Sequence, residues 1–298
     1  MADPTSERLP SYGGQAVIEG VMMRGRRACA IAVRAPGSGI VVRTLPLGRF
    51  YRSRLAQLPF FRGLFLLWDA LVLGMRALAF SADVQAGEEQ KVSGAPMALT
   101  MVAALTVGVG VFFLLPAALG YLVERLWGWN AWWVNVLEGL VRLGLLIGYV
   151  WAIGLWVEVR RVYGYHSAEH KTINAFEAGA ALTVERVAAF PREHPRCGTA
   201  FLLTLVVLSI LLFSLLGPLP LASRLASRLL LLPLLAALAY EYIRITSSWA
   251  RYAWAKPLVA ANLALQRLTT REPDGAMIEV AIAAFQAMQA EEHGQAPP

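Results

Sequence analysis

Residues 92–123 form an unbroken stretch without a single Asp, Glu, Lys or Arg. A helix of about 20 apolar residues crosses the hydrocarbon core of a bilayer, and this stretch is longer than that. Further apolar stretches occupy residues 132–157, 198–216 and 226–245. Only 16% of the chain is charged, against about 25% in ordinary soluble domains. The sequence therefore predicts a multi-span membrane protein and argues against a soluble enzyme.

The segments between these stretches predict a mainly α fold: a polytopic membrane helical bundle of about four spans with two additions. Residues 13–45 contain short apolar runs separated by glycines and a turn-rich segment, which predicts a small N-terminal β-rich cytoplasmic element. Arg62, Asp69 and Arg76 recur every seven residues, so an amphipathic helix that is interfacial or re-entrant is expected there. The predicted divisions are 1–59 (β-rich element), 60–91 (amphipathic helix and linker), 92–157 (first helical hairpin), 158–197 (cytoplasmic metal-site loop), 198–246 (second helical hairpin) and 247–298 (C-terminal helices).

Arginine placement predicts the orientation in the membrane. The first 62 residues contain ten arginines and three acidic residues, and positive charge favours the cytoplasmic side. If segment 60–80 does not cross, four spans place both termini and residues 158–197 in the cytoplasm, at the inner membrane. The expected partners are the lipid bilayer and a membrane-associated substrate, and a homo-oligomer is left open. A nucleic-acid partner is disfavoured, because the net charge of +7 is explained by contact with anionic lipid.

Three of the four histidines and one of the two cysteines fall between residues 158 and 197. His166 and His170 are four residues apart, so on a helix they lie one turn above each other on one face. With Glu169 they form H-x-x-E-H, the inverted zinc-hydrolase motif, in which the glutamate acts as a general base on water. We therefore predict metal ligands at His166, His170, His194 and Cys197.

The nature of the ion and the roles of three further residues are hypotheses at this stage. A mixed His/Cys shell suits zinc best, with iron and manganese as alternatives. Glu169 is the candidate general base, or else a ligand or a partner of an imidazole. Glu177 lies on the same helical stripe but about 10 Å from His170 along the axis, so it cannot share that ion directly. It is a catalytic candidate that faces the substrate, contacts a ligand or belongs to a second site. Lys171 is a candidate for neutralising a phosphate or carboxylate, or else a surface lysine.

Five motifs resemble the YqhQ-like family, a bacterial inner-membrane family classed as a domain of unknown function (1385) and often labelled a predicted metal-dependent enzyme. They are residues 14–24 (GQAVIEGVMMR), 165–177 (YHSAEHKTINAFE), 182–185 (LTVE), 194–199 (HPRCGT) and 266–274 (QRLTTREPD). The resemblance extends from about Tyr12 to about Phe285. It implies a polytopic membrane protein with a cytoplasmic metal site and supplies no substrate. Ser167 stands where the family often has glycine, so a small residue is kept.

The sequence supports two hypotheses about function. In the first, the chain is a membrane-embedded, metal-dependent hydrolase acting at the cytoplasmic membrane surface on a lipid-linked or membrane-peptide substrate. In the second, it is a non-enzymatic scaffold, assembly factor or transporter, in which a closed metal site holds the loop 158–197 in place.

Overall fold

The computed structural model describes residues 12–37, 39–47, 58–87, 94–249 and 252–294. It is mainly helical, with one small antiparallel sheet near the N-terminus. The strands are β1 (Gly13–Val17), β2 (Gly20–Arg24), β3 (Ala28–Arg34) and β4 (Ile40–Pro46). The helices are α1 (Phe61–Ala86), α2 (Ala95–Val109), α3 (Leu115–Trp127), α4 (Ala131–Ile153), α5 (Val157–Glu177), α6 (Val184–Ala188), α7 (Gly198–Ser214), α8 (Leu221–Leu230), α9 (Leu232–Trp249), α10 (Lys256–Thr269) and α11 (Gly275–His293). A π-helical turn, η3 (Gly110–Leu114), joins α2 to α3, and a 3-10 turn, η4 (Ala253–Ala255), precedes α10.

The sheet is a simple meander in the order β1-β2-β3-β4, and helices cover both of its faces. Val21, Met23 and Ala30 point to a core shared with α5 and α11. The alternate residues Met22 and Ile31 point to a second core against α1. Burial on both faces explains why β2 and β3 read as nearly continuous apolar runs rather than as alternating ones.

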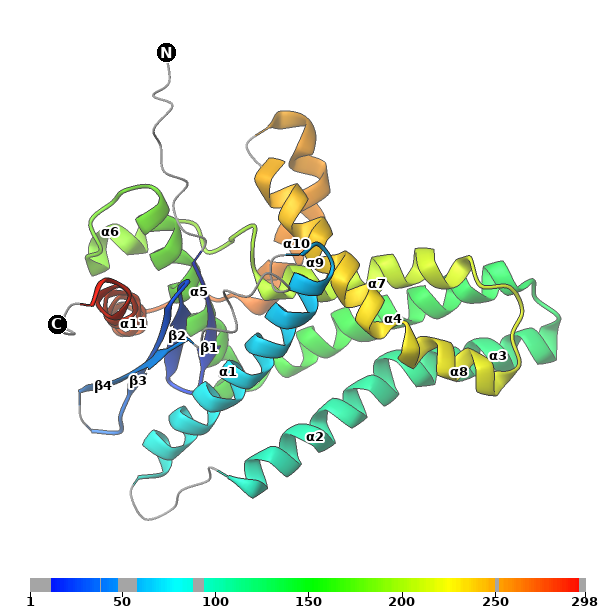
Figure 1. Ribbon diagram of the computed structural model, residues 1–298, viewed down its shortest axis with the longest axis horizontal. Coiled ribbons are helices and arrows are strands. Elements are labelled where there is room, and N and C mark those ends of the chain that lie inside the picture. Colours follow the sequence, from blue (N-terminus) through cyan, green and yellow to red (C-terminus); the bar gives the residue numbers. More distant parts are fainter. Residues whose placement is uncertain (1–11, 38, 48–57, 88–93, 250–251, 295–298) are drawn as a thin grey trace.

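The N-terminal sheet, the central helix α5 and the C-terminal helix α11 thus form one body (Figure 1). Helix α11 is buried almost all round, although the sequence pattern predicts one apolar face. Small alanines between its larger residues allow this, because they let the sheet and α5 approach from different sides. The predicted β-rich element and both predicted C-terminal helices are confirmed.

Three helices in the described ranges are long and apolar enough to cross a membrane: α1, the continuous helix formed by α2, η3 and α3, and α4. Helices α8 and α9, bent by 43° at their junction, make a fourth if they count as one broken span. This is compatible with a membrane protein. The four predicted stretches recur, but the third is the 17-residue α7 and the fourth contains the bend. Segment 60–80 lies within one continuous helix, α1, which packs one face on the sheet and on α9.

In helix α8 the charged side chains face inward and the apolar ones outward, the reverse of a surface helix on a soluble protein. Its two arginines, Arg224 and Arg228, are buried against the bundle, whereas Leu229 and Leu230 are exposed. An apolar outside and a charged inside suit a helix surrounded by lipid, where ionisable groups face the bundle interior and find partners there.

A buried charge network lies between α4, α7 and α8. Glu138 accepts from Arg142 at 2.8 Å and from Arg228 at 2.6 Å. Arg142 also donates from Nε to the carbonyl oxygen of Phe112, in the π-helical turn, at 2.7 Å. Such turns leave carbonyls without the usual helical partner, which gives this arginine an acceptor inside an apolar helix.

Replacing Glu138 with leucine leaves two buried guanidinium groups without their shared carboxylate. We expect a loss of about 3–5 kcal/mol of stability, the usual cost of breaking a buried ion pair on one side. The matched control is Glu158→Leu, on an exposed position of α5. Thermal unfolding of both variants in the same detergent is the measurement, and equal midpoints would contradict the role given to Glu138.

Candidate metal centre

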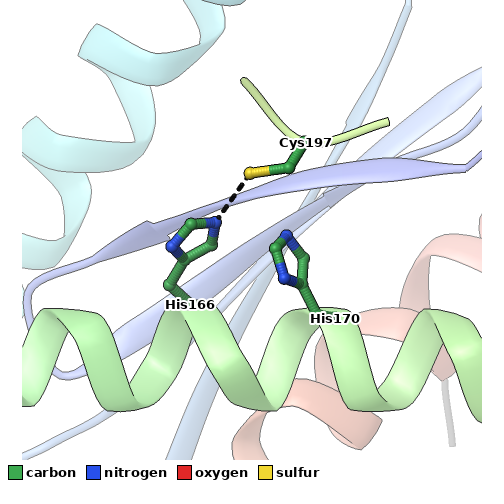
Figure 2. A group of neighbouring side chains, drawn as sticks. All are labelled: His166, His170 and Cys197. Carbon is green, nitrogen blue, oxygen red and sulfur yellow. Dashed lines mark hydrogen bonds between the residues drawn. The ribbon is translucent and has the colours of Figure 1, made fainter. Parts of the chain in front are cut away.

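Helix α5 carries the H-x-x-E-H motif and is largely enclosed, although its sequence is polar. Apolar residues such as Tyr165, Ala168 and Ile173 face the core shared with the sheet and α11. The histidines fall on another side of the helix. Figure 2 shows His166 and His170 rising from the same side of α5 toward Cys197, which caps the N-terminus of α7.

Three ligand atoms converge here. One nitrogen from each of His166 and His170 and the sulfur of Cys197 all lie within 4.8 Å of one another. His166 Nε2 is 3.1 Å from Cys197 Sγ. Zinc binds nitrogen at about 2.0–2.1 Å and sulfur at about 2.3 Å, so tetrahedral ligands are about 3.3–3.8 Å apart. Small side-chain adjustments would bring the three donors to that spacing, and two imidazoles with one thiolate suit zinc chemically.

The main chain fixes both imidazoles in the orientation that metal binding needs. His166 Nδ1 is 2.9 Å from the carbonyl oxygen of Thr269, and His170 Nδ1 is 2.6 Å from that of Arg192. A carbonyl oxygen only accepts hydrogen bonds, so each Nδ1 carries the proton in the neutral ring. Each Nε2 then keeps its lone pair for an ion.

Cys197 is held by contacts with the first turn of α7. Its Sγ accepts from the backbone amide of Thr199 at 3.4 Å and lies 3.1 Å from the Thr199 hydroxyl. It stands at the N-terminus of α7, where the unpaired amides carry partial positive charge. The sequence pattern indicated Cys197 but not Thr199. A helix that begins directly after a cysteine would have indicated that residues of its first turn contact the sulfur.

Glu169 lies beside the two ligands and is buried. Burial raises its pKa to about 7, and the charge of His166 and a hydrogen bond from the Gly14 amide only partly oppose this. Gly14 belongs to β1, so the N-terminal sheet forms one wall of the site. A Cβ on Gly14 would lie 2.6 Å from the Met22 carbonyl oxygen and 2.8 Å from the Glu169 carboxyl carbon, so a side chain does not fit.

His194 does not join the three-atom group within the described residues. Its ring centre is 5.7 Å from that of His170, and its Nε2 lies 3.6 Å from Glu177. Burial lowers the pKa of His194 despite the opposing effect of Glu177, so the ring is neutral at neutral pH. Three of the four predicted ligands thus lie together, whereas His194 lines the same cavity but lies nearer Glu177, and its place in the ligand set stays a prediction.

Glu177 and Lys171 stand outside the ligand group. Glu177 pairs with Arg196; burial alone would raise its pKa, but His194 and Arg196 together lower it. Lys171 donates from Nζ to the Ala188 carbonyl oxygen at 2.8 Å and pairs with Glu272 at 2.7 Å. That side chain leaves α5 on the side of α6, so the structure does not bring it to the ligands as a catalytic cation.

A cavity of about 330 Å³ opens onto the ligands. It is lined by residues of β1, α5, the segment 194–199 and the end of α10: Gly13, Gly14, Gln15, Ala16, Val162, Tyr163, His166, Glu169, His170, Ile173, His194, Arg196, Cys197, Gly198, Thr199 and Thr269. The cavity therefore brings together four segments that are far apart in the sequence.

Residues 58–291 match the family described as "Protein of unknown function (DUF1385)". Over 293 residues the chain is 33% identical to the "Uncharacterized protein YqhQ" of Bacillus subtilis (strain 168), covering 93% of this chain and 91% of that protein. The chain belongs to this family. The family indicated by its motifs is thereby confirmed, whereas the metal-dependent enzyme implied by that resemblance stays a prediction. Comparison with solved structures gives no match.

His166, His170 and Cys197 are candidate ligands whose removal should differ in effect from removal of His194. We expect Cys197→Ser and His170→Ala to lose bound zinc, because each removes one of three donors. His194→Ala is expected to retain it. Metal analysis of the detergent-purified protein, dialysed against the same free zinc concentration, is the measurement. If His194→Ala lost as much zinc as Cys197→Ser, His194 would be a fourth ligand.

The second prediction concerns the wall formed by β1. Gly14→Ala places a methyl group against the Met22 carbonyl and Glu169, so we expect a loss of about 1–3 kcal/mol, as for overpacked sites. Gly13→Ala is the control, since nothing lies within 4 Å of its added Cβ. Thermal unfolding measures both, and a Gly14→Ala protein as stable as Gly13→Ala would show that β1 does not contact Glu169 closely.

Proposed function

We propose that the protein is a metal-dependent hydrolase of the bacterial inner membrane, with zinc as its ion. The observation that carries this proposal is the pair of imidazoles whose Nδ1 atoms face main-chain carbonyls and whose Nε2 atoms face one thiol. Three protein ligands with a free fourth position are the arrangement of catalytic zinc sites, whereas structural sites use four.

The ion would supply a Lewis acid that polarises the scissile carbonyl and activates water. In this proposal Glu169 takes the proton of the attacking water, since it borders the same cavity and is next to His170 in the sequence. Arg196 and the N-terminus of α7 also line the cavity, and their positive charge would stabilise the oxyanion that develops. Glu177 then acts indirectly, by positioning Arg196 and His194.

The alternative, a structural metal that holds the loop before α7, is less well supported. That loop already has its own hydrogen bonds to the rest of the protein. Asn174 donates to the carbonyl oxygens of Pro191 and Glu193 at 2.8 and 3.1 Å, and Gln266 donates to that of His194 at 2.8 Å. A segment held by these bonds does not need an ion to fix it.

The position of the cavity favours a substrate at the membrane surface. It opens beside the first residues of α7, an apolar helix that continues into the bundle. A lipid-linked molecule or a membrane peptide would reach the ligands there. With the arginine-rich N-terminus in the cytoplasm, the site faces the inner leaflet and both termini are cytoplasmic.

Glu169→Gln tests the enzymatic proposal. The zinc-loaded wild type and variant are incubated, in detergent, with a peptide digest and with a lipid extract of bacterial membranes, and products are identified by mass spectrometry. We expect Glu169→Gln to keep its zinc and to lose about 10²–10⁴-fold in the rate of product formation, as for removal of a general base.

The matched control is Glu185→Gln, on an exposed position of α6. A wild type that forms no zinc-dependent product from either mixture, or a Glu169→Gln protein as active as Glu185→Gln, would overturn the proposed hydrolase.

A further inference from the structure

Strand β1 is an edge strand, and its free edge runs along the cavity. Among the described residues it pairs with β2 alone, and a two-residue turn at Ile18 and Glu19 joins the two strands. In such a hairpin the residues that flank the turn, Val17 and Gly20, form a hydrogen-bonded pair, and pairing then alternates along the strands. The amides and carbonyls of Gly14 and Ala16 therefore point away from β2.

An independent contact confirms that register. The Gly14 amide donates to the Glu169 carboxylate, which belongs to α5 and not to the sheet. Within the described ranges, none of the backbone hydrogen bonds outside regular elements uses the Gly14 carbonyl or either backbone group of Ala16. These groups lie in the lining of the cavity that contains the metal ligands.

The hairpin is also held firmly against α5. Glu19, at the turn, has a left-handed backbone with φ of 51° and pairs with Arg161 of α5. Tyr165 of α5 donates its hydroxyl to the same carboxylate at 3.2 Å. The Arg161 hydrogen bond lowers the pKa of Glu19 despite partial burial, so this connection is ionised at neutral pH. The distance between the free edge of β1 and the histidines of α5 is thereby fixed.

We propose that the substrate is an extended polypeptide segment that pairs with β1 as an additional strand and presents one peptide carbonyl to His166, His170 and Cys197. This rests on the proposed function and specifies its substrate class. Main-chain hydrogen bonds to an exposed strand edge are a general mode of peptide recognition. Gly13 and Gly14 have no side chains to hold the peptide backbone away from this edge.

The reaction that follows is hydrolysis of one peptide bond. The oxygen of water bonds to the carbonyl carbon, and Glu169 accepts the proton that the water loses. The C–N bond then breaks, and the leaving nitrogen takes that proton to become an amine. The products are a carboxylate and an amine, and no oxidant or reductant is consumed.

The backbone groups favour a peptide over an acyl chain. A peptide strand advances about 3.4 Å per residue and offers an amide and a carbonyl toward its neighbour at every second residue. This matches the Gly14 carbonyl and the amide and carbonyl of Ala16, while the Gly14 amide is already bonded to Glu169. An acyl chain has no hydrogen-bond donors or acceptors. If it covered the outward amides and carbonyls of β1, these groups would lose their bonds to water without replacement, which would weaken binding.

Three zinc-binding probes separate the possibilities on the full-length, zinc-loaded protein in detergent. They are acetohydroxamate, octanohydroxamate and a trialanine amide with an N-terminal succinyl hydroxamate, and their dissociation constants are measured by calorimetry. We expect the peptide probe to bind about tenfold or more tightly than acetohydroxamate, the gain from two or three backbone hydrogen bonds.

Ala16→Pro removes the outward amide of β1, at a position where an edge strand tolerates proline. We expect it to abolish the peptide gain and to leave acetohydroxamate binding unchanged, whereas Ala16→Ser keeps the amide and the gain. If Ala16→Pro does not fold, a second measurement uses the wild type and peptide probes methylated at successive nitrogens. Pairing with β1 predicts that methylation abolishes the gain at every second nitrogen only.

Each outcome has one meaning. Failure of acetohydroxamate to bind would overturn the proposed metal centre itself. Binding of acetohydroxamate without any peptide gain, a gain that survives Ala16→Pro, or equal effects of methylation at successive nitrogens would overturn the peptide proposal alone. A larger gain for octanohydroxamate, insensitive to Ala16→Pro, would also overturn it and assign the cavity to an acyl chain.

Discussion

The enclosure of α5 is the constraint on which the rest of the structure depends. This helix carries charged and polar side chains on most of its surface, yet the sheet, α6 and α11 pack against it. Thr269 at the end of α10 and Arg192 in the loop before α7 also contact it. Burying polar groups is costly unless each finds a partner, so the surrounding segments supply main-chain carbonyls at fixed places. His166, His170, Lys171 and Asn174 each face such a carbonyl. The same bonds that stabilise the helix also orient the two imidazoles.

Much of this arrangement follows from local sequence, because it depends on residues close together in the chain. The H-x-x-E-H spacing places two imidazoles on one helical face whatever lies around it, and the hairpins follow from apolar runs between turn residues. The carbonyls of Thr269 and Arg192 leave no such signal, since every residue has a carbonyl and only tertiary packing selects one. The contact between Gly14 and Glu169 spans more than half the chain and depends equally on packing. His194 shows the same limit: its short spacing to Cys197 suggested a shared ion, but the contact of its Nε2 with Glu177 could not be read from that spacing.

The sheet serves two purposes at once, and they constrain each other. Its central strands fill the space between α1 and α11 with apolar side chains, which fixes its position. Its first strand is left at the edge, where Gly14 approaches Glu169 and leaves no room for a side chain. A sheet with more strands on that side would cover the cavity. Gly14 of β1 is therefore best understood through its close approach to Glu169 of α5 rather than through turn formation.

The buried arginines of α8 have a consequence for the order in which the chain folds during synthesis. A helix with two arginines enters apolar surroundings readily only where acceptors are already in place, and here these are Glu124 of α3 for Arg224 and Glu138 of α4 for Arg228. Ribosomes make Glu138 about ninety residues before Arg228, and domains generally fold in the order of synthesis. The carboxylate of Glu138 is thus already present when Arg228 is synthesised. In a circularly permuted chain that began at α8, these arginines would be synthesised before their carboxylate partners. Burial of α8 would then be delayed until those partners were made, which the natural order of synthesis avoids.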